Sequence, residues 1–294
     1  MGKYSGWVWV LLAAVAGCGL GYWLLGGGPG PVPSAVSPPT ALAQNCAGGP
    51  AGAAAANRSG MASLVFAPFH RPEIGWATYA PLVAHEIGTP CDGASPGFAA
   101  RLAAWQVAHR LPATGVMDVT TFGAMKAIWD RRRPFEAASR IACPAPPDPA
   151  SLAVVPAAQS YGGKRLLLRP GALAAYERLW TAARASLPAM RTDPRLMSLF
   201  SAFRSPAEDD ARCAREGNCE GVVRASCSAH RTGLAMDIFL GAAPGFDPAS
   251  SADANRLYIS RGPAYRWLVA NAGRFGFVNY AFEPWHWEWT GEAI

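Results

Sequence analysis

The sequence predicts an α+β fold for residues 150–294, with a small helical domain at residues 75–137 in front of it. Both regions carry apolar residues at helical spacing, which is typical of amphipathic helices. Only the C-terminal region adds short alternating apolar runs, which favour strands. The 294 residues are 51% hydrophobic and 16% charged, so the chain can bury sizeable cores and is not disordered as a whole.

The first 25 residues predict a membrane anchor. Residues 6–25 carry no charge, and a helix of this length spans roughly 30 Å, the thickness of the hydrocarbon core of a bilayer. Lys3 precedes this segment, and the positive-inside rule then places the rest of the chain outside the cytoplasm. Two alternatives stay open: a lipoprotein processed at Cys18, and a secreted form cleaved near residues 41–43. All three place the rest of the chain outside the cytoplasm.

Residues 26–74 are predicted to be a linker. Residues 26–60 consist largely of Gly, Pro and Ala, with Arg58 as the single charged residue. Such a composition offers few large side chains from which to build a core. A linker of this length would let a tethered domain reach material above the membrane.

Six cysteines besides Cys18 predict disulfides, because an even number of cysteines outside the cytoplasm is typical of oxidised pairs. Cys213 and Cys219 are close enough in the chain to close a short loop. The partner of Cys227 stays open, with Cys143 as one candidate. A metal site built from the last three cysteines is the alternative, but the segment has no CxxC pair.

A helical hairpin is predicted within residues 75–137. A helix is expected at residues 96–110, a turn at 112–115, and a second helix capped by Asp118. The segment resembles the small peptidoglycan-binding repeat of cell-wall hydrolases, with Arg110 in place of a glycine. The matching residues are Gln106, Gly115, Asp118 and Thr120. The resemblance implies peptidoglycan binding, and a hairpin that serves only for packing is the alternative.

The C-terminal region follows a Pro-rich segment at residues 143–156. One helix is expected at residues 173–183, and another, capped by Ser260, at residues 265–272. The predicted strands are residues 196–203, 235–240, 275–280 and 285–289. Elsewhere, the basic run at residues 131–133 is predicted to be a solvated helix end.

Two histidine motifs in this region, SAHRTGLAMD and EPWHWEW, predict a metal site. His230, Asp237 and His286 would supply the ligands, since two imidazoles and one carboxylate suit zinc and leave a position for water. Asp237 favours this interpretation because a carboxylate within an apolar run is costly to bury without a cation. Glu283 is the candidate base that takes a proton from the water. The alternative is two core histidines and an ion-paired aspartate. The other histidines are predicted to be structural or exposed: His70, His85 and His109.

These motifs resemble those of the zinc D-Ala-D-Ala carboxypeptidases. That family has SxHxxGxAxD followed by ExxH near the C-terminus, includes vancomycin-resistance carboxypeptidases, and shares its fold with the hedgehog signalling domain. The resemblance covers residues 150–294 and implies a hedgehog/DD-peptidase-like zinc peptidase domain. It implies the zinc ligands His230, Asp237 and His286, and the catalytic base Glu283.

A further motif of the family, SxYRS, is matched by residues 201–205 with Phe203 in place of Tyr. The resemblance implies that Arg204 polarises the scissile carbonyl and stabilises charge on its oxygen. Ser228 is a further candidate for contact with the substrate. Asp209 stands where the family has a glutamine, which leaves recognition of the end of the substrate open.

The sequence therefore predicts an exported, inner-membrane-anchored zinc metallopeptidase that hydrolyses an amide bond in peptidoglycan stem peptides, as a D-alanyl-D-alanine-type carboxypeptidase. LD-carboxypeptidase and endopeptidase activities stay open, and a non-catalytic, zinc-stabilised wall-binding module is the alternative from another class. Glu283 and Arg204 favour the enzyme. The expected partners are stem peptides and the membrane. The net charge of +6 is scattered along the chain and predicts no nucleic-acid partner.

Overall fold

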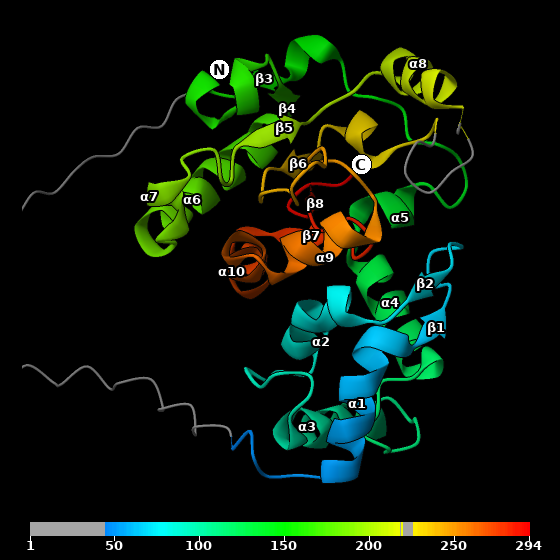
Figure 1. Cartoon of the computed structure of the whole chain (residues 1–294). Coiled ribbons are helices and arrows are strands. Elements are labelled where there is room, and N and C mark those ends of the chain that lie inside the picture. The colour runs from blue at the N-terminus through cyan, green and yellow to red at the C-terminus, as the bar shows by residue number, and fades with distance from the viewer. Residues whose placement is uncertain (1–44, 218, 220–225) are drawn as a thin grey trace, which may run out of the picture. The chain divides into compact units, whose positions relative to one another are not determined.

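A four-stranded antiparallel sheet forms the centre of the C-terminal region (Figure 1). The computed structural model describes residues 45–217, 219 and 226–294, which belong to one compact unit. The strands run in the order β5 (Leu199–Ser201), β6 (Ala235–Ile238), β8 (His286–Trp289) and β7 (Phe277–Asn279). Each lies within a segment where the sequence predicts a strand, so the mixed helix and sheet character of this region is confirmed.

The register of the two central strands brings polar residues together. Asp237 of β6 lies directly opposite His286 of β8, and on its other side it pairs with Ser201 of β5. Side chains that lie directly opposite each other in an antiparallel pair have Cβ atoms only about 5 Å apart. All four residues of β6 are buried, so its carboxylate enters the core between two neighbouring strands.

Helices α6 (Pro170–Ser186), α9 (Asp253–Arg261) and α10 (Pro263–Asn271) share one hydrophobic core with the sheet. The helix predicted at residues 173–183 is confirmed by α6. The prediction that Ser260 caps the next helix is wrong, because Ser260 lies inside α9 and its hydroxyl bonds to a carbonyl oxygen of the same helix. Gly262 precedes α10 instead, and Pro263 occupies its first turn, where a missing N–H costs nothing.

Smaller elements complete this region. Two short strands, β3 (Ala153–Val154) and β4 (Leu167–Leu168), form an antiparallel pair. The remaining helices of the region are α7 (Ala189–Thr192), α8 (Pro206–Glu216), and the 3-10 turns Pro149–Ser151, Ala157–Gln159, Tyr161–Gly163, Ala229–Thr232 and Ala272–Phe275. Helix α8 begins with a capping box between Ser205 and Glu208.

The helical region forms a second hydrophobic core. Its helices are α1 (Ala51–Ser63), a 3-10 turn at Ala77–Tyr79, α2 (Ala80–Glu86), α3 (Pro96–Ala108), α4 (Val119–Arg132) and α5 (Pro134–Ala138). Strands β1 (Val65–Phe66) and β2 (Glu73–Ile74) form an antiparallel pair beside them. Helices α3 and α4 lie where the sequence predicts the hairpin, and Asp118 caps α4 as expected.

The structure differs from the predicted linker over residues 51–74, where it has α1 and the β1–β2 pair. Alanine has the highest helix propensity, so an Ala-rich segment can become a helix once it finds a surface on which to pack. Asn57 provides a specific attachment: its buried amide donates to Gly115 O and accepts from Met117 N, each over 2.8 Å. The boundaries of the two domains otherwise stay predictions.

Three of the residues that resemble the peptidoglycan-binding repeat, Gln106, Gly115 and Asp118, have structural roles. Gln106 is fully buried, accepts from Gly115 N over 2.8 Å and donates to Val116 O over 3.1 Å. Gly115 has a φ of +67°, and a Cβ there would lie 2.6 Å from Ala99 O, so only glycine fits. Asp118 accepts from the backbone at the start of α4. These bonds fix the turn between α3 and α4.

A buried arginine joins the two cores. Arg256 of α9 donates through Nε to Phe282 O over 2.7 Å, and its Nη1 lies 3.2 Å from Glu73 Oε2 of β2. Tyr79 also accepts from this guanidinium. Phe282 itself belongs to the core of the helical region. Removal of one partner from a buried ion pair typically costs about 3–5 kcal/mol, so this network is expected to hold the two regions together.

Three disulfides are present among the described residues: Cys46–Cys91, Cys143–Cys227 and Cys213–Cys219. The short pair predicted between Cys213 and Cys219 is therefore confirmed, and Cys143 is the partner of Cys227 that the sequence left open. The metal site considered for these cysteines is wrong, because all three are oxidised.

None of the helices in the described ranges is both long and apolar enough to cross a membrane. The anchor predicted at residues 6–25, the lipidation site at Cys18 and the cleavage site at residues 41–43 all lie outside the described residues.

Asn57→Ala should destabilise the protein by roughly 2–4 kcal/mol, because it leaves a buried carbonyl and a buried N–H without a partner. Chemical denaturation of the purified chain measures this difference. Ser59→Ala, an exposed position of the same helix, should unfold like the parent. Equal stability of the Asn57 and Ser59 variants would contradict the attachment described for α1.

Cys213→Ser should lower the melting temperature only modestly, since a loop this short contributes under about 3 kcal/mol through chain entropy. Cys143→Ser opens a loop with a sequence separation of 84 and should cost more, roughly 4–5 kcal/mol. Thermal unfolding under oxidising conditions compares the two. Peptide mapping that finds Cys213 as a free thiol would exclude the short pair.

Candidate metal centre and active site

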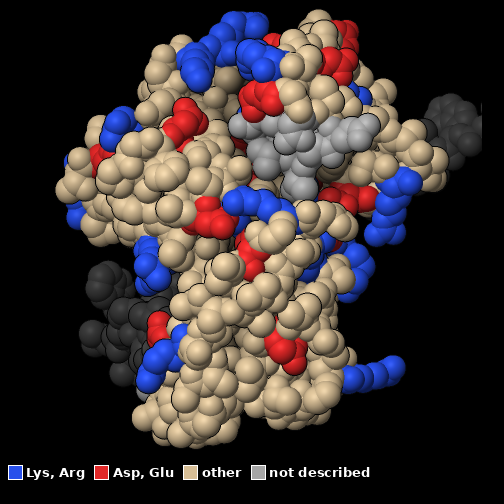
Figure 2. Space-filling model, turned by 45° about the vertical axis from the view of Figure 1, so that its right-hand side comes forward, with Lys and Arg blue, Asp and Glu red and all other residues tan. Residues whose placement is uncertain are grey.

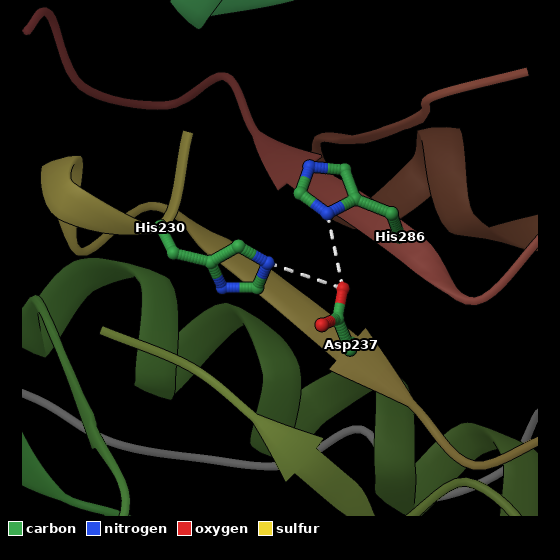
Figure 3. A group of neighbouring side chains, drawn as sticks. All are labelled: His230, Asp237 and His286. Carbon is green, nitrogen blue, oxygen red and sulfur yellow. Dashed lines mark hydrogen bonds and ion pairs between the residues drawn. The ribbon is translucent and has the colours of Figure 1, made fainter. Parts of the chain in front are cut away.

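Three buried side chains converge at the centre of the sheet (Figure 3). His230 comes from the 3-10 turn before β6, Asp237 from β6 itself, and His286 from the first position of β8. Atoms able to bind a metal, one from each residue, lie within 4.8 Å of one another. The structure thus brings together the three residues that the sequence predicts as ligands.

The protonation of His230 follows from its hydrogen bond. Its Nδ1 lies 2.7 Å from Ala202 O, and because a carbonyl oxygen can only accept, Nδ1 carries the hydrogen. Burial and the nearby charge of Arg204 lower the pKa of His230 to about 4, so the ring is neutral at pH 7. Its Nε2 lone pair therefore faces Asp237 Oδ1 at 3.2 Å. Two acceptors at this distance fit a cation between them.

His286 approaches the same carboxylate oxygen from the neighbouring strand. Its Nδ1 lies 3.0 Å from Asp237 Oδ1, and its Nε2 lies 3.4 Å from Glu288 Oε1. Burial lowers the pKa of His286, but the hydrogen bond to Asp237 and the nearby carboxylate of Glu288 outweigh it and raise the pKa to about 9. Without a metal, a proton on His286 thus supplies positive charge beside Asp237. A bound divalent cation would take over that role and displace the proton.

Glu283 lies beside this group without belonging to it. Its Oε2 is 3.9 Å from His286 Nδ1, and its side chain is 12% exposed. A turn fixes its place, since Glu283 N donates to Tyr280 O and His286 N donates to Glu283 O, each over 2.9 Å. The ExxH spacing therefore directs a carboxylate toward the metal position, where it can exchange a proton with water.

Arg204 reaches the pocket from the segment after β5 and is held by three side chains. Its Nε donates to Asp209 Oδ1 over 2.8 Å, and its Nη1 donates to Ser201 Oγ over 2.8 Å. Its Nη2 donates to Ser228 Oγ over 3.1 Å. Asp209 thus forms an ion pair with the arginine in place of the family's glutamine. Ser228 also accepts from His230 N, so it connects the arginine to the metal ligands.

One pocket of about 370 Å³ is lined by the two histidines and the aspartate together with Glu283, Arg204 and Ser228. Its wall also includes side chains of the helical region that the sequence did not indicate: Phe69, His70, Lys126, Asp130, Arg133, Phe135 and Glu136. Acidic and basic side chains lie close to one another on the face shown in Figure 2, without a continuous basic surface. Of the histidines outside the centre, His70 lines this pocket, whereas His109 stacks on Trp105.

The prediction that residues 131–133 form a solvated helix end is wrong for Arg133. Its side chain is only 6% exposed and lies against Glu288 of β8. The sequence distinguishes it from its neighbours only by the proline that follows it, which ends α4 and turns the chain toward the sheet.

The fold brings three possible metal ligands, a carboxylate and an arginine to one pocket, an arrangement that suits hydrolytic chemistry. Residues 165–292 match the model of the family described as VanY, D-alanyl-D-alanine carboxypeptidase. The C-terminal region of the chain therefore belongs to the VanY family, and the predicted family is confirmed. Members act on peptides of the cell wall, which indicates an enzyme that works outside the cytoplasm.

Two solved structures are similar to the chain. The LdcB LD-carboxypeptidase is 21% identical with a TM-score of 0.34, over 50% of this chain and 72% of that chain. A Zn(II) complex of a mutant vancomycin-resistance D,D-pentapeptidase VanY, from a VanB-type cassette, is 22% identical with a TM-score of 0.29. That match covers 50% of this chain and 83% of the other. No curated protein matches the chain.

Removal of bound metal with a chelator should lower the melting temperature of the parent, because two buried acceptors then lack the cation between them. His286→Ala lacks one of the three ligands, so the chelator should shift its melting temperature far less. Scanning fluorimetry with and without chelator measures both shifts. His85→Ala, in α2 and away from this pocket, should keep the parent's shift. Equal shifts in the parent and His286→Ala would contradict this metal centre.

Proposed function

We propose that this chain is a zinc metallopeptidase that hydrolyses an amide bond in peptidoglycan stem peptides, as a D-alanyl-D-alanine-type carboxypeptidase. The observation that carries the proposal is the pair of acceptors His230 Nε2 and Asp237 Oδ1, which face each other in a buried site with Glu283 beside them. The VanY family match supports the substrate class.

The residues divide the work of hydrolysis. When bound, a zinc ion supplies Lewis acidity toward a carbonyl oxygen and toward water. Glu283 Oε2 accepts a proton from the water and delivers it to the nitrogen of the leaving amine. Arg204 directs its guanidinium at the carbonyl oxygen and stabilises the negative charge that develops there. Ser228 holds Arg204 and the turn of His230 in place, and so acts on the substrate side of the pocket.

Two other peptidase activities would fit the same site. An LD-carboxypeptidase or an endopeptidase would use the same ligands and base, and would differ in how the pocket receives the end of the peptide. The ion pair between Asp209 and Arg204 partly neutralises a cation that would otherwise be available to a terminal carboxylate. Mass spectrometry of the products from purified muropeptides distinguishes the three activities.

The proposed place of action rests on the N-terminal sequence. We propose that residues 6–25 anchor the chain in the inner membrane with the catalytic domain outside, and a lipid on a mature N-terminal Cys18 would replace this assignment. Peptidoglycan binding by residues 75–137 is part of the same proposal and would raise the local concentration of enzyme at the wall. Pull-down on purified sacculi tests that binding separately from catalysis.

Glu283→Gln should lower the turnover rate by about 10²- to 10⁴-fold, because the amide keeps the volume of the side chain but cannot accept the proton. Bound zinc should stay at the parent level, since Glu283 is not one of the three ligands. The assay measures release of D-alanine, or of a cut peptide, from wall-derived substrates, with zinc determined on the same samples.

The control is Glu177→Gln on α6, which does not line the pocket and should leave turnover unchanged. Full activity of Glu283→Gln would remove the assignment of the base. A parent protein that binds zinc yet cleaves no DD, LD or cross-linked substrate would favour the alternative of a non-catalytic wall-binding module.

A further inference from the structure

Glu288 lies two positions after the metal ligand His286 on strand β8 and is almost completely buried. Its Oε1 lies 3.4 Å from His286 Nε2, a buried nitrogen that has no hydrogen-bond partner among the described residues. The other nitrogen of that ring, Nδ1, is the one directed at Asp237 and the metal position. Glu288 thus lies on the outer side of the ring, where an acceptor can fix its orientation.

The partners of Glu288 come from the helical region. Arg133 donates to its Oε1 through Nε over 2.7 Å, and Arg133 Nη2 lies 2.7 Å from the same oxygen. The backbone N–H of Phe135, in the first turn of α5, donates to Oε2 over 3.1 Å. The end of α4 and the start of α5 therefore hold both oxygens of a carboxylate that belongs to the central sheet.

Arg133 is itself fixed in place. Its guanidinium lies over the ring of Tyr280 at 4.0 Å from the centroid, and its Nη1 pairs with Glu136 over 2.9 Å. Tyr280 in turn meets the ring of His286 edge to face at 5.9 Å. Arg133 therefore lies against Glu288 in a fixed position, between an aromatic ring and a second carboxylate.

We propose that Arg133 and Glu288 are positioning residues of the metal centre, through which the helical region sets the orientation of His286. Glu288 is placed to accept the hydrogen of Nε2, which leaves the lone pair of Nδ1 for the metal, and Arg133 holds Glu288 in that place. Carboxylates in this outer position orient ligating histidines and raise their basicity. This inference rests on the proposed zinc site.

A purely structural role is the competing explanation, since a buried ion pair also joins the two regions. The two explanations differ in what they predict for metal affinity. A structural pair affects the stability of the metal-free protein and leaves the affinity of the folded protein for zinc unchanged. A positioning pair changes that affinity, and also the ligand field of a bound spectroscopic metal.

The experiment uses the full chain and the variants Arg133→Met, Arg133→Lys and Glu288→Gln. Zinc affinity is measured by competition with a chromophoric chelator, and the visible spectrum is recorded with Co²⁺ in place of zinc. Arg133→Met and Glu288→Gln should bind zinc about 10- to 100-fold more weakly than the parent, the usual cost of losing an outer partner of a ligand. Arg133→Lys keeps the charge and should recover part of the loss. The Co²⁺ spectrum should change in the same order.

The matched control is Arg132→Met. Arg132 is the neighbour of Arg133 in the chain, but its side chain is 49% exposed and pairs with Glu86. Its removal should leave zinc affinity and the Co²⁺ spectrum at the parent values. A double variant, Arg133→Met with Glu288→Gln, should lose little more affinity than Glu288→Gln alone, because the arginine acts through the carboxylate.

Parent-like zinc affinity in folded Arg133→Met would overturn the inference, and so would additive losses in the double variant. If Arg133→Met does not fold, Arg133→Lys with an unchanged affinity and spectrum overturns it instead. The same measurements distinguish failure of this inference from failure of the proposed function. A parent that binds zinc and releases product, with variants that keep its affinity, contradicts only this inference. A parent without peptidase activity, with variants that bind zinc weakly, contradicts only the function.

Discussion

The carboxylate of Asp237 lies in the middle of a four-stranded sheet, with an imidazole on either side and apolar residues along the rest of its strand. A charge in such a place is stable only when a cation accompanies it. A protonated His286 can provide that charge within the protein, and a divalent metal can provide it more strongly. Because Nδ1 of His230 donates to Ala202 O, its Nε2 carries no hydrogen. His230 therefore donates no hydrogen bond to the carboxylate of Asp237. Three further features place side chains around Asp237. They are the turn before β6, the register of β6 on β8 and the position of Glu283.

The grouping of His230, Asp237 and His286 could be predicted because its determinants are local. A run such as LAMDIFL is recognisable as a strand that contains one charged residue, and the ExxH spacing places Glu283 within one turn of His286. The four central strands and α6 follow from apolar periodicity in the same way. Ser260 was misassigned as a cap because a serine near an apolar run is a common signal, whereas the true boundary is the Gly262–Pro263 step.

The contribution of the helical region could not be predicted, because it depends on contacts between residues far apart in the chain. Arg133 is one of three consecutive arginines, and only its position after α4 and before a proline turns it inward. The helix α1 was missed for a related reason: its alanines bury little area by themselves, and Asn57 gains its bonds only once the turn at Gly115 exists. In both cases a polar side chain bonds to a residue far away in the sequence, and a local sequence pattern does not predict such a contact.

The Cys143–Cys227 disulfide makes the wall of the pocket beside Ser228 dependent on oxidation. The group of His230, Asp237 and His286 has no such dependence. Cys227 lines the pocket and directly precedes Ser228, and its partner lies in the segment that leaves the helical region. Cysteine pairs of this kind form in oxidising compartments, whereas histidine and aspartate ligands need no oxidation. His230, Asp237 and His286 can therefore come together by folding alone, whereas the covalent link beside Ser228 also needs an oxidising environment. This wall of the pocket is complete only once the two cysteines are oxidised.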